Sequence, residues 1–203
     1  MSNLQRWSLL AALYLAQGIP YGFFTQALPV LLREQGLSLK MISATSLLYL
    51  PWALKFLWAP LVDRYGTRRQ WLLPLQMSAV IGAALLSLID AASALWLLVL
   101  ALFAFNLISA TQDIATDGLA VNLLTARERG LGNGIQTGGY RVGMMLGGGL
   151  LLWMFAQFGS QAMFIAMTAM LAMTVLPVLF LSEERPALKR APADHRSVWN
   201  GAW

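Results

Sequence analysis

Six long apolar runs dominate this sequence and leave few folds open to it. A helix needs about 20 mainly apolar residues to cross a bilayer, and each run is close to that length or longer. The connecting segments are short, so consecutive helices are expected to be antiparallel neighbours. The sequence therefore predicts an all-α, polytopic bundle of six transmembrane helices. These helices are expected at about residues 7–32, 41–62, 71–89, 94–119, 134–158 and 161–181.

The composition supports a membrane protein. The chain is 58% hydrophobic and 11% charged, whereas a soluble domain is about 25% charged. It contains no cysteine, which excludes disulfides and cysteine-ligated metals. Its net charge of +5 falls in the gaps between the apolar runs and forms no basic face. We therefore expect a lipid bilayer as the surroundings, with no nucleic-acid partner, cofactor or metal.

The distribution of lysine and arginine predicts the orientation. The side of the membrane that is richer in these residues normally faces the cytoplasm, which would place both termini inside, in a cytoplasmic (inner) membrane. Residues 1–181 would form one transmembrane domain, and residues 182–203 a cytoplasmic tail or the start of a central loop. The richer side carries Arg6, Arg64, Arg68, Arg69, Arg127, Arg129, Arg185, Lys189, Arg190 and Arg196, and the other side carries Arg33 and Lys40.

The fourth apolar run ends in a polar face. Its members share one side of a helix and are Ser109, Gln112, Asp113, Thr116 and Asp117. Lipid would repel such a face, so it should point into the bundle. Ionisable groups at membrane depth are costly and usually mark a path for a substrate or a proton. Asp113 and Asp117 are therefore candidates for proton coupling.

Two cations, Arg141 and Lys55, are expected at depths in the membrane similar to that of Asp113. Arg141 lies about 15 Å from the cytoplasmic turn and Asp113 about 12 Å, by helical rise. We expect Arg141 to pair with Asp113 or Asp117, either as a static contact or as one that breaks during transport. Lys55 lies about 10 Å above the end of the second run. It could snorkel or form a structural ion pair, or act directly on substrate.

The first apolar run contains candidate substrate contacts. Gln17, Tyr21 and Gln26 follow at roughly helical spacing, and Gln112 joins them from the fourth run. Pro20 and Pro29 predict a broken helix, which is tolerated only beside protein or a water-filled cavity. An ordinary kink with normal helix packing would explain the same pattern.

Glycine recurs every fourth residue along the fifth run. Such a stripe lets two helix backbones approach closely. No strand precedes these glycines, and their spacing does not fit a nucleotide-binding loop. The stripe consists of Gly139, Gly143 and Gly147, with Gly134 and Gly138 adding another step.

The loop after the second run carries a specific motif. It reads Asp63-Arg64-Tyr65-Gly66-Thr67-Arg68-Arg69. Gly66 permits a tight turn, and Asp63 is placed to meet the positive end of a neighbouring helix. The motif resembles the G-x-L-A-D-R-x-G-R-R loop of the major facilitator superfamily. Ala59 replaces the leading glycine, and Thr67 replaces one basic residue.

Within that superfamily the chain resembles the AmpG-like permeases. The resemblance covers most of residues 55–150 in the right order, and the opening residues 15–29 look more like the siderophore-importing members. It implies a proton-driven permease that imports a polar organic solute such as a siderophore or a muropeptide. The matching pieces include residues 55–65 and 69–73, Gln112-Asp113-Ile114-Ala115-Thr116-Asp117, Glu128-Arg129-Gly130 and Gly139-Tyr140-Arg141-Val142-Gly143-Met144.

The resemblance also exposes a departure. Such transporters have twelve helices in two halves with the substrate between them, and this chain supplies one half. The missing half or a second copy would then be the partner, besides the solute and protons. The alternative is a truncated, non-transporting half that serves as an assembly partner or is a relic. An enzyme is not expected, because no nucleophile–base pair, metal cluster or phosphate loop is visible.

Overall fold

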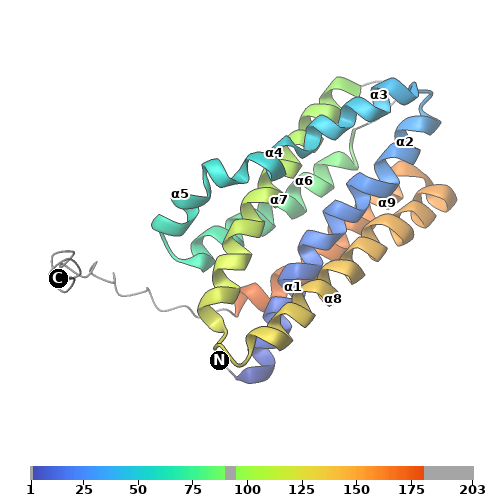
Figure 1. Cartoon of the computed structure of the whole chain (residues 1–203). Coiled ribbons are helices and arrows are strands. Elements are labelled where there is room, and N and C mark those ends of the chain that lie inside the picture. Colours follow the sequence, from blue (N-terminus) through green and yellow to red (C-terminus); the bar gives the residue numbers. More distant parts are fainter. Residues whose placement is uncertain (1, 90–94, 181–203) are drawn as a thin grey trace, which may run out of the picture.

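The computed structural model describes residues 2–89 and 95–180, and every regular element in these two stretches is helical. Figure 1 shows the longer helices lying side by side along one direction. The predicted tail at 182–203 lies outside the described residues. The elements are α1 (Asn3–Gly22), the π-helix η1 (Phe23–Ala27), α2 (Leu28–Glu34), α3 (Leu39–Ala44), the 3₁₀-helix η2 (Thr45–Tyr49), α4 (Leu50–Leu54), the 3₁₀-helix η3 (Lys55–Leu57), α5 (Ala59–Arg64), α6 (Arg68–Leu86), α7 (Leu95–Leu123), α8 (Arg129–Met145), the π-helix η4 (Leu146–Leu150) and α9 (Leu151–Leu179).

Within the described residues, two helical stretches are long and apolar enough to cross a membrane. They are Trp96–Leu123 and Arg129–Leu179. The second stretch is broken at Gly159, whose φ of 82° is far from helical. This break falls where the sequence predicted the connection between the fifth and sixth spans. The all-α membrane bundle is therefore confirmed, while the count of six spans stays a prediction.

The first two predicted helices are irregular. α1 continues through Pro20, and the irregularity comes afterwards as the π-helical turn η1. The second predicted helix is divided into α3, η2, α4, η3 and α5. Pro51 and Pro60 each stand near the start of one of these pieces, because a proline cannot donate the backbone bond of a helix interior. A 3₁₀ segment inside a helix often marks a functional hinge.

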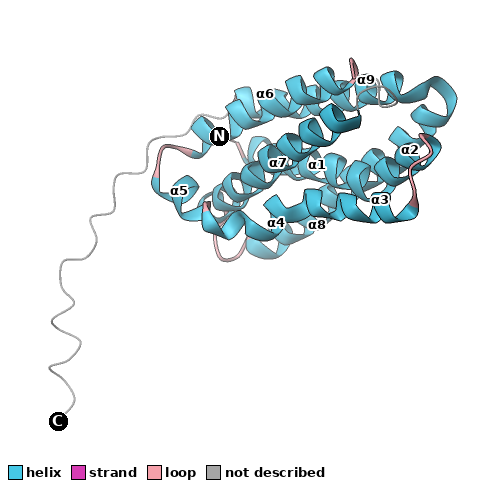
Figure 2. Cartoon of the chain, turned by 90° about the horizontal axis from the view of Figure 1, so that it is seen from above, coloured by secondary structure: helices cyan, strands magenta, loops and turns pink. Residues whose placement is uncertain are grey.

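The helices form layers around a buried core. In Figure 2, α4 and α8 lie along one face, α7 and α1 lie in the middle, and α6 and α9 lie on the opposite face. Large aromatic side chains fill the interior, and Phe23, Phe105 and Phe164 are fully buried. Phe23 stacks edge-on against Phe164 at 5.6 Å between ring centroids, which ties η1 to α9. The middle helices are therefore the ones that position a central site.

α1 and α8 pack closely through small residues. A side chain at Gly143 would lie 2.8 Å from Gly18 Cα and 2.9 Å from Ile19 N. Gly147 likewise faces the backbone of Ile19. These contacts leave no room for a Cβ, so the predicted close approach is confirmed at Gly143 and Gly147. Gly134 and Gly138, in contrast, face open space.

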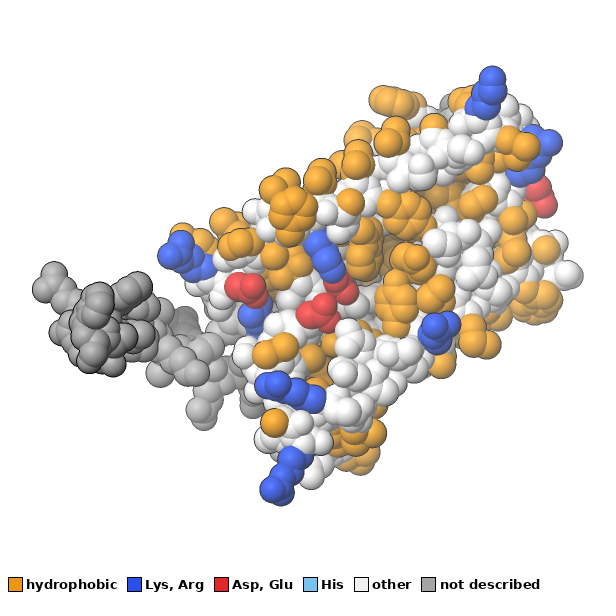
Figure 3. Space-filling view, viewed as in Figure 1, with side chains coloured by type: hydrophobic (Ala, Val, Ile, Leu, Met, Phe, Trp, Pro, Cys, Tyr) orange, Lys and Arg blue, Asp and Glu red, His pale blue; other side chains and the backbone are white. Residues whose placement is uncertain are grey.

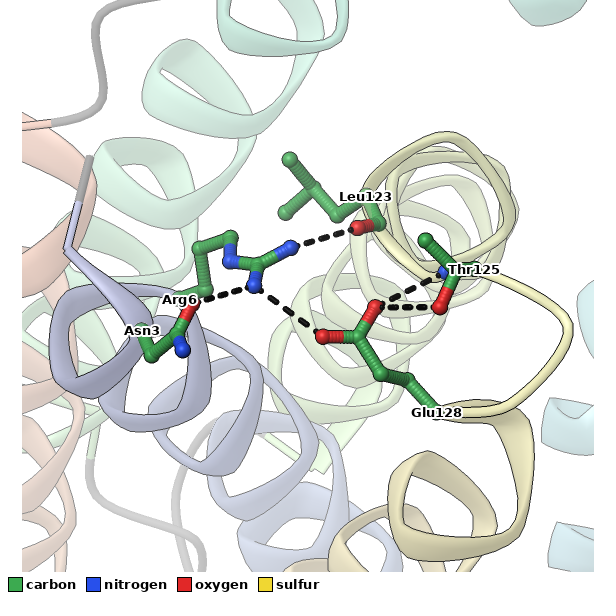
Figure 4. A network of polar contacts seen from close by, with 5 residues as sticks. All are labelled: Asn3, Arg6, Leu123, Thr125 and Glu128. Atoms are coloured by element: carbon green, nitrogen blue, oxygen red, sulfur yellow. Dashed lines mark hydrogen bonds and ion pairs between the residues drawn. The ribbon is translucent and has the colours of Figure 1, made fainter.

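A polar clamp ties α1 to the turn between α7 and α8 (Figure 4). Arg6 donates to Leu123 O at 3.1 Å and to Glu128 Oε1 at 3.1 Å, and it also contacts Asn3. Glu128 Oε2 accepts from the Thr125 amide at 2.9 Å and from its hydroxyl at 2.8 Å. The two Thr125 bonds, together with Arg6, hold the pKa of Glu128 below its ordinary value. The clamp fixes one end of three helices.

Candidate functional site: a polar cavity between four helices

A cavity of about 520 Å³ opens between α1, α4, α7 and α8. It is called the central cavity below. In Figure 3, side chains of both charges gather in a hollow on this side of the molecule. The cavity is large enough for a small organic solute. Its lining consists of Tyr14, Gln17, Tyr21, Trp52, Lys55, Asp113, Gln136, Thr137, Tyr140, Arg141 and Met144.

Lys55 and Asp113 form an ion pair in the wall of the central cavity. Asp113 is the more deeply placed partner, with 11% of its side chain exposed against 34% for Lys55. Lys55 begins the 3₁₀-helix η3, so its backbone lies at an interruption between α4 and α5. The ammonium also lies 5.5 Å from the centre of the Trp52 ring. The pair thus faces the cavity from a segment with hinge-like geometry.

Arg141 is placed differently from the prediction. It lines the same cavity from α8 and is exposed. Within the described part of the chain it forms no ion pair with Asp113 or Asp117, so the predicted pairing is not formed. Lys55 takes that position because η3 carries it beside α7. An uncompensated guanidinium remains in the cavity wall.

Asp117 is held by neutral donors. Tyr14 donates its hydroxyl to Oδ1 at 3.2 Å, and Gln136 donates its amide to the same oxygen at 3.4 Å. These residues come from α1 and α8, so Asp117 joins three helices. Asp117 is absent from the lining of the central cavity, although Tyr14 and Gln136 belong to it. The two predicted acidic groups therefore have different surroundings.

Aromatic rings form one wall of the central cavity. The ring of Tyr21 lies 5.5 Å from that of Tyr140, 6.4 Å from Trp52 and 6.1 Å from Tyr49, measured between centroids. Trp52 is also fixed by a hydrogen bond from Nε1 to Asn106 Oδ1 at 3.1 Å. Such rings offer apolar faces for a ligand at low entropic cost. The wall suits a solute with a flat or apolar surface as well as polar groups.

Gln17 adds an unused donor. It is buried, lines the central cavity, and its Nε2 has no hydrogen-bond partner among the described residues. A buried amide without a partner costs free energy unless a ligand or water satisfies it. Gln17 and Tyr21 thus both lie in the cavity, as the sequence suggested.

The other two predicted substrate contacts lie elsewhere. Gln26 is exposed and its amide lies against Gly148, outside the lining of the central cavity. Gln26 lies within the π-helical turn η1, which widens the helix and shifts the face on which this side chain lies. Gln112 is buried and also does not line this cavity. It neighbours Asp113 in sequence, but adjacent helical residues point about 100° apart.

The loop motif forms a local network at the start of α6. Arg68 Nη2 lies 2.7 Å from Asp63 Oδ1, and its guanidinium packs over Gly118 of α7. Gly66 has a φ of 76°, in the left-handed region expected for the tight turn. The motif therefore connects the turn to α7. Arg64 is exposed at the end of α5, and Arg69 donates to Leu179 O at 3.2 Å.

Sequence reasoning missed several lining residues. Trp52, Tyr14, Gln136 and Tyr140 were not singled out as contacts. Gln136 and Tyr140 lie four residues apart on α8, and Thr137 and Arg141 repeat this spacing beside them. A search for pairs of polar residues four positions apart along α8 would have found them. Trp52 had no such signal, because the 3₁₀ interruptions remove the regular period of its helix.

One family profile and several known proteins match most of this chain. The Major Facilitator Superfamily profile matches residues 7–202. An uncharacterized protein of Haemophilus influenzae is 36% identical over 172 residues, which cover 82% of this chain and 40% of that protein. The anhydromuropeptide permease of Escherichia coli K12 is 35% identical over 185 residues, covering 88% of this chain and 38% of the permease.

The match is to part of each relative. The chain spans about two fifths of the length of these relatives. A putative transporter of Rickettsia felis is more distant, at 25% identity over 84% of this chain and 44% of its own length. The extent of the profile match, the helical bundle and the charged central cavity agree with one another. This chain belongs to the major facilitator superfamily.

Proposed function

We propose that this chain is a six-helix half of a secondary transporter that imports a polar organic solute across the cytoplasmic membrane, with both termini inside. The observation that carries the proposal is the central cavity, which combines one ion pair, one unpaired cation and an aromatic wall. The similarity to an anhydromuropeptide permease favours a muropeptide as the solute. A ferric siderophore is the second candidate, suggested by residues 15–29.

The charges of the cavity favour an anionic solute. Lys55 and Asp113 neutralise each other, so Arg141 leaves a net positive charge in the wall. Arg141 can bind a carboxylate through two parallel hydrogen bonds. Gln17 can satisfy its free amide on a neutral oxygen of the same solute. The rings of Tyr21, Trp52 and Tyr140 can cover the apolar part.

The ion pair supplies a way to couple a proton to transport. If Asp113 takes up a proton, Lys55 loses its counter-ion and becomes available to the solute. Loss of the pair would also release η3, the interruption that carries Lys55. Proton binding and rearrangement of the helix would then occur together. Asp113 is therefore our choice for the coupling carboxylate.

The cavity also needs a second wall. In this superfamily the substrate lies between two halves, and the hollow in Figure 3 is open on one side. We infer that the remaining half, or a second copy of this chain, covers it. A chain that only assembles with a partner would keep the same packing and carry no solute.

Uptake in living cells tests the proposal. Cells without their own anhydromuropeptide permease would express this chain alone, or together with the C-terminal half of the Escherichia coli permease. Uptake of labelled anhydromuropeptide is expected in at least one arrangement, and it should fall with an uncoupler or with Asp113→Asn. Uptake of a labelled ferric siderophore, without uptake of anhydromuropeptide, would identify the siderophore as the solute. Failure of both solutes in both arrangements would favour the non-transporting half, and unchanged, uncoupler-insensitive uptake by Asp113→Asn would remove the proton role.

A further inference from the structure

A second cavity lies next to the central one. It has a volume of about 450 Å³ and lies between α1, α7 and α8. Tyr14 and Gln136 line both cavities, so these two side chains form the partition between them. Both donate to the same oxygen of Asp117. The second cavity is lined by Tyr14, Asp117, Ala120, Val121, Leu124, Arg129, Asn133 and Gln136.

Asp117 presents an unused acceptor to this cavity. The donors from Tyr14 and Gln136 both reach Oδ1, and Oδ2 accepts no hydrogen bond from any described residue. No described cation forms an ion pair with it. Arg68, which borders a neighbouring groove with Asp117, is committed to Asp63 at 2.7 Å. A carboxylate at this depth needs a cationic partner or a proton.

Arg129 presents the complementary group at the other end. It begins α8, is exposed, and makes no ion pair or hydrogen bond within residues 2–89 and 95–180. Asp117 lies six residues before the end of α7, which corresponds to about 9 Å of helical rise. The acid is therefore deep in the cavity and the base is near its mouth. Asn133 and Gln136 supply neutral polar groups on the wall.

We propose that the second cavity binds a zwitterionic group of the amino-acid type, with its ammonium on Asp117 Oδ2 and its carboxylate on Arg129. An amino-acid group has these two charges a few ångströms apart, and a hydrogen bond of about 2.9 Å at each end extends its reach. An anion alone would leave Asp117 unpaired, and a cation alone would leave Arg129 unpaired. The pairing of both charges favours the zwitterion over either simple ion.

The position of this subsite gives it a role in transport. This role in transport rests on the proposed function. A solute ammonium on Oδ2 would bind the carboxylate whose Oδ1 accepts from Tyr14 and Gln136, so the subsite adjoins the partition between the two cavities. The subsite therefore lies on the path between the central cavity and the mouth beside Arg129. It would hold an amino-acid portion of the solute, while the central cavity holds the remainder.

Thiol labelling tests the subsite without a transport assay. The chain has no native cysteine, so Val121→Cys provides a single reporter inside the second cavity. Val121 is 69% exposed, so the change leaves the core intact. The rate of reaction with N-ethylmaleimide would be measured in detergent with alanine, alaninamide or propionate at equal concentration. We expect alanine to slow labelling several-fold and the two single-charge analogues to slow it much less.

Matched variants identify the residues responsible. Asp117→Asn or Arg129→Gln in the reporter background should abolish protection by alanine. Arg127→Gln should not, because Arg127 lies in the same turn and lines neither cavity. Val142→Cys, which is exposed on α8 outside both cavities, should show no protection.

Absence of protection by alanine, or equal protection by propionate or alaninamide, would overturn the proposal. If alanine gives no selective protection but uptake is normal, the subsite is refuted and the proposed transport function stands. If alanine still protects the reporter cysteine but no uptake is measured, the result counts against the proposed transport function.

Discussion

Asp113 is paired with Lys55, while Arg141 lines the same cavity without a carboxylate partner among residues 2–89 and 95–180. In this arrangement, neutralisation of the buried acid and binding of a ligand are assigned to different cations. One cation neutralises the buried acid, and the other remains available to a ligand. Leaving Arg141 unpaired costs little because its side chain is exposed.

Breaking the Lys55–Asp113 pair should destabilise the chain. Lys55→Met or Asp113→Leu leaves one charge without its counter-ion. The loss for a fully buried pair is about 3–5 kcal/mol, and we expect less here because 34% of the Lys55 side chain is exposed. The double variant Lys55→Met with Asp113→Leu should recover most of the loss. Thermal unfolding of all four proteins in detergent measures this, and single variants that melt like the parent would show that the pair is irrelevant to stability.

The glycines of α8 should differ sharply in their tolerance of alanine. At Gly143 a Cβ would meet Gly18 Cα at 2.8 Å, so alanine forces α1 and α8 apart at a cost of about 1–3 kcal/mol. At Gly138 no atom lies within 4 Å, and the higher helix propensity of alanine can add up to about 1 kcal/mol. Melting temperatures of Gly143→Ala and Gly138→Ala give a matched comparison. Equal effects would contradict the close packing of the two helices.

The clamp at Glu128 should make stability depend on acid pH. Hydrogen bonds from Thr125, and then Arg6, lower the pKa of Glu128 in the folded state. A lowered pKa means that the stabilisation is fully present above the ordinary value of 4.5 and is lost as pH falls through the lowered value. Melting curves should therefore shift downward below that pH in the parent and less in Glu128→Gln.

Glu34→Gln serves as the control for the clamp. Glu34 is an exposed glutamate at the end of α2 and lies outside the clamp, so this variant should behave like the parent. An acid dependence that Glu128→Gln leaves unchanged would assign the effect to other carboxylates.

The sequence predicted which charged residues lie close together in the bundle, but it did not predict which of them form an ion pair. Lys55, Asp113 and Arg141 could be placed at similar depths because helical rise converts residue number into distance. The bounds of the apolar runs placed a connection between residues 158 and 161, where Gly159 breaks the helix. The choice of partner for Asp113 could not be predicted, because it depends on the 3₁₀ turn at Lys55. Gln26 was misplaced for a similar reason, since the π-helical turn that contains it breaks the regular period.

The second cavity shows another limit of sequence reasoning. Asp117 was recognised as a membrane carboxylate from its position, but its partners Tyr14 and Gln136 come from helices distant in the chain. Arg129 was read as part of the cytoplasmic charge bias and of the Glu128-Arg129-Gly130 piece of the resemblance, and not as a cavity residue. Its place in the lining of a cavity follows from how α7 and α8 both pack against α1, which no local pattern encodes.

Anhydromuropeptide uptake by Arg141→Gln, compared with Arg127→Gln, tests the central cavity most directly. Both variants lose one arginine charge, but only Arg141 lines the cavity. A hydrogen bond to a charged group contributes about 1.5–3 kcal/mol, so we predict a fall of roughly 10- to 100-fold in uptake at low solute concentration for Arg141→Gln. Arg127→Gln should match the parent. Equal uptake by the two variants would contradict the assignment of the cavity as the solute site.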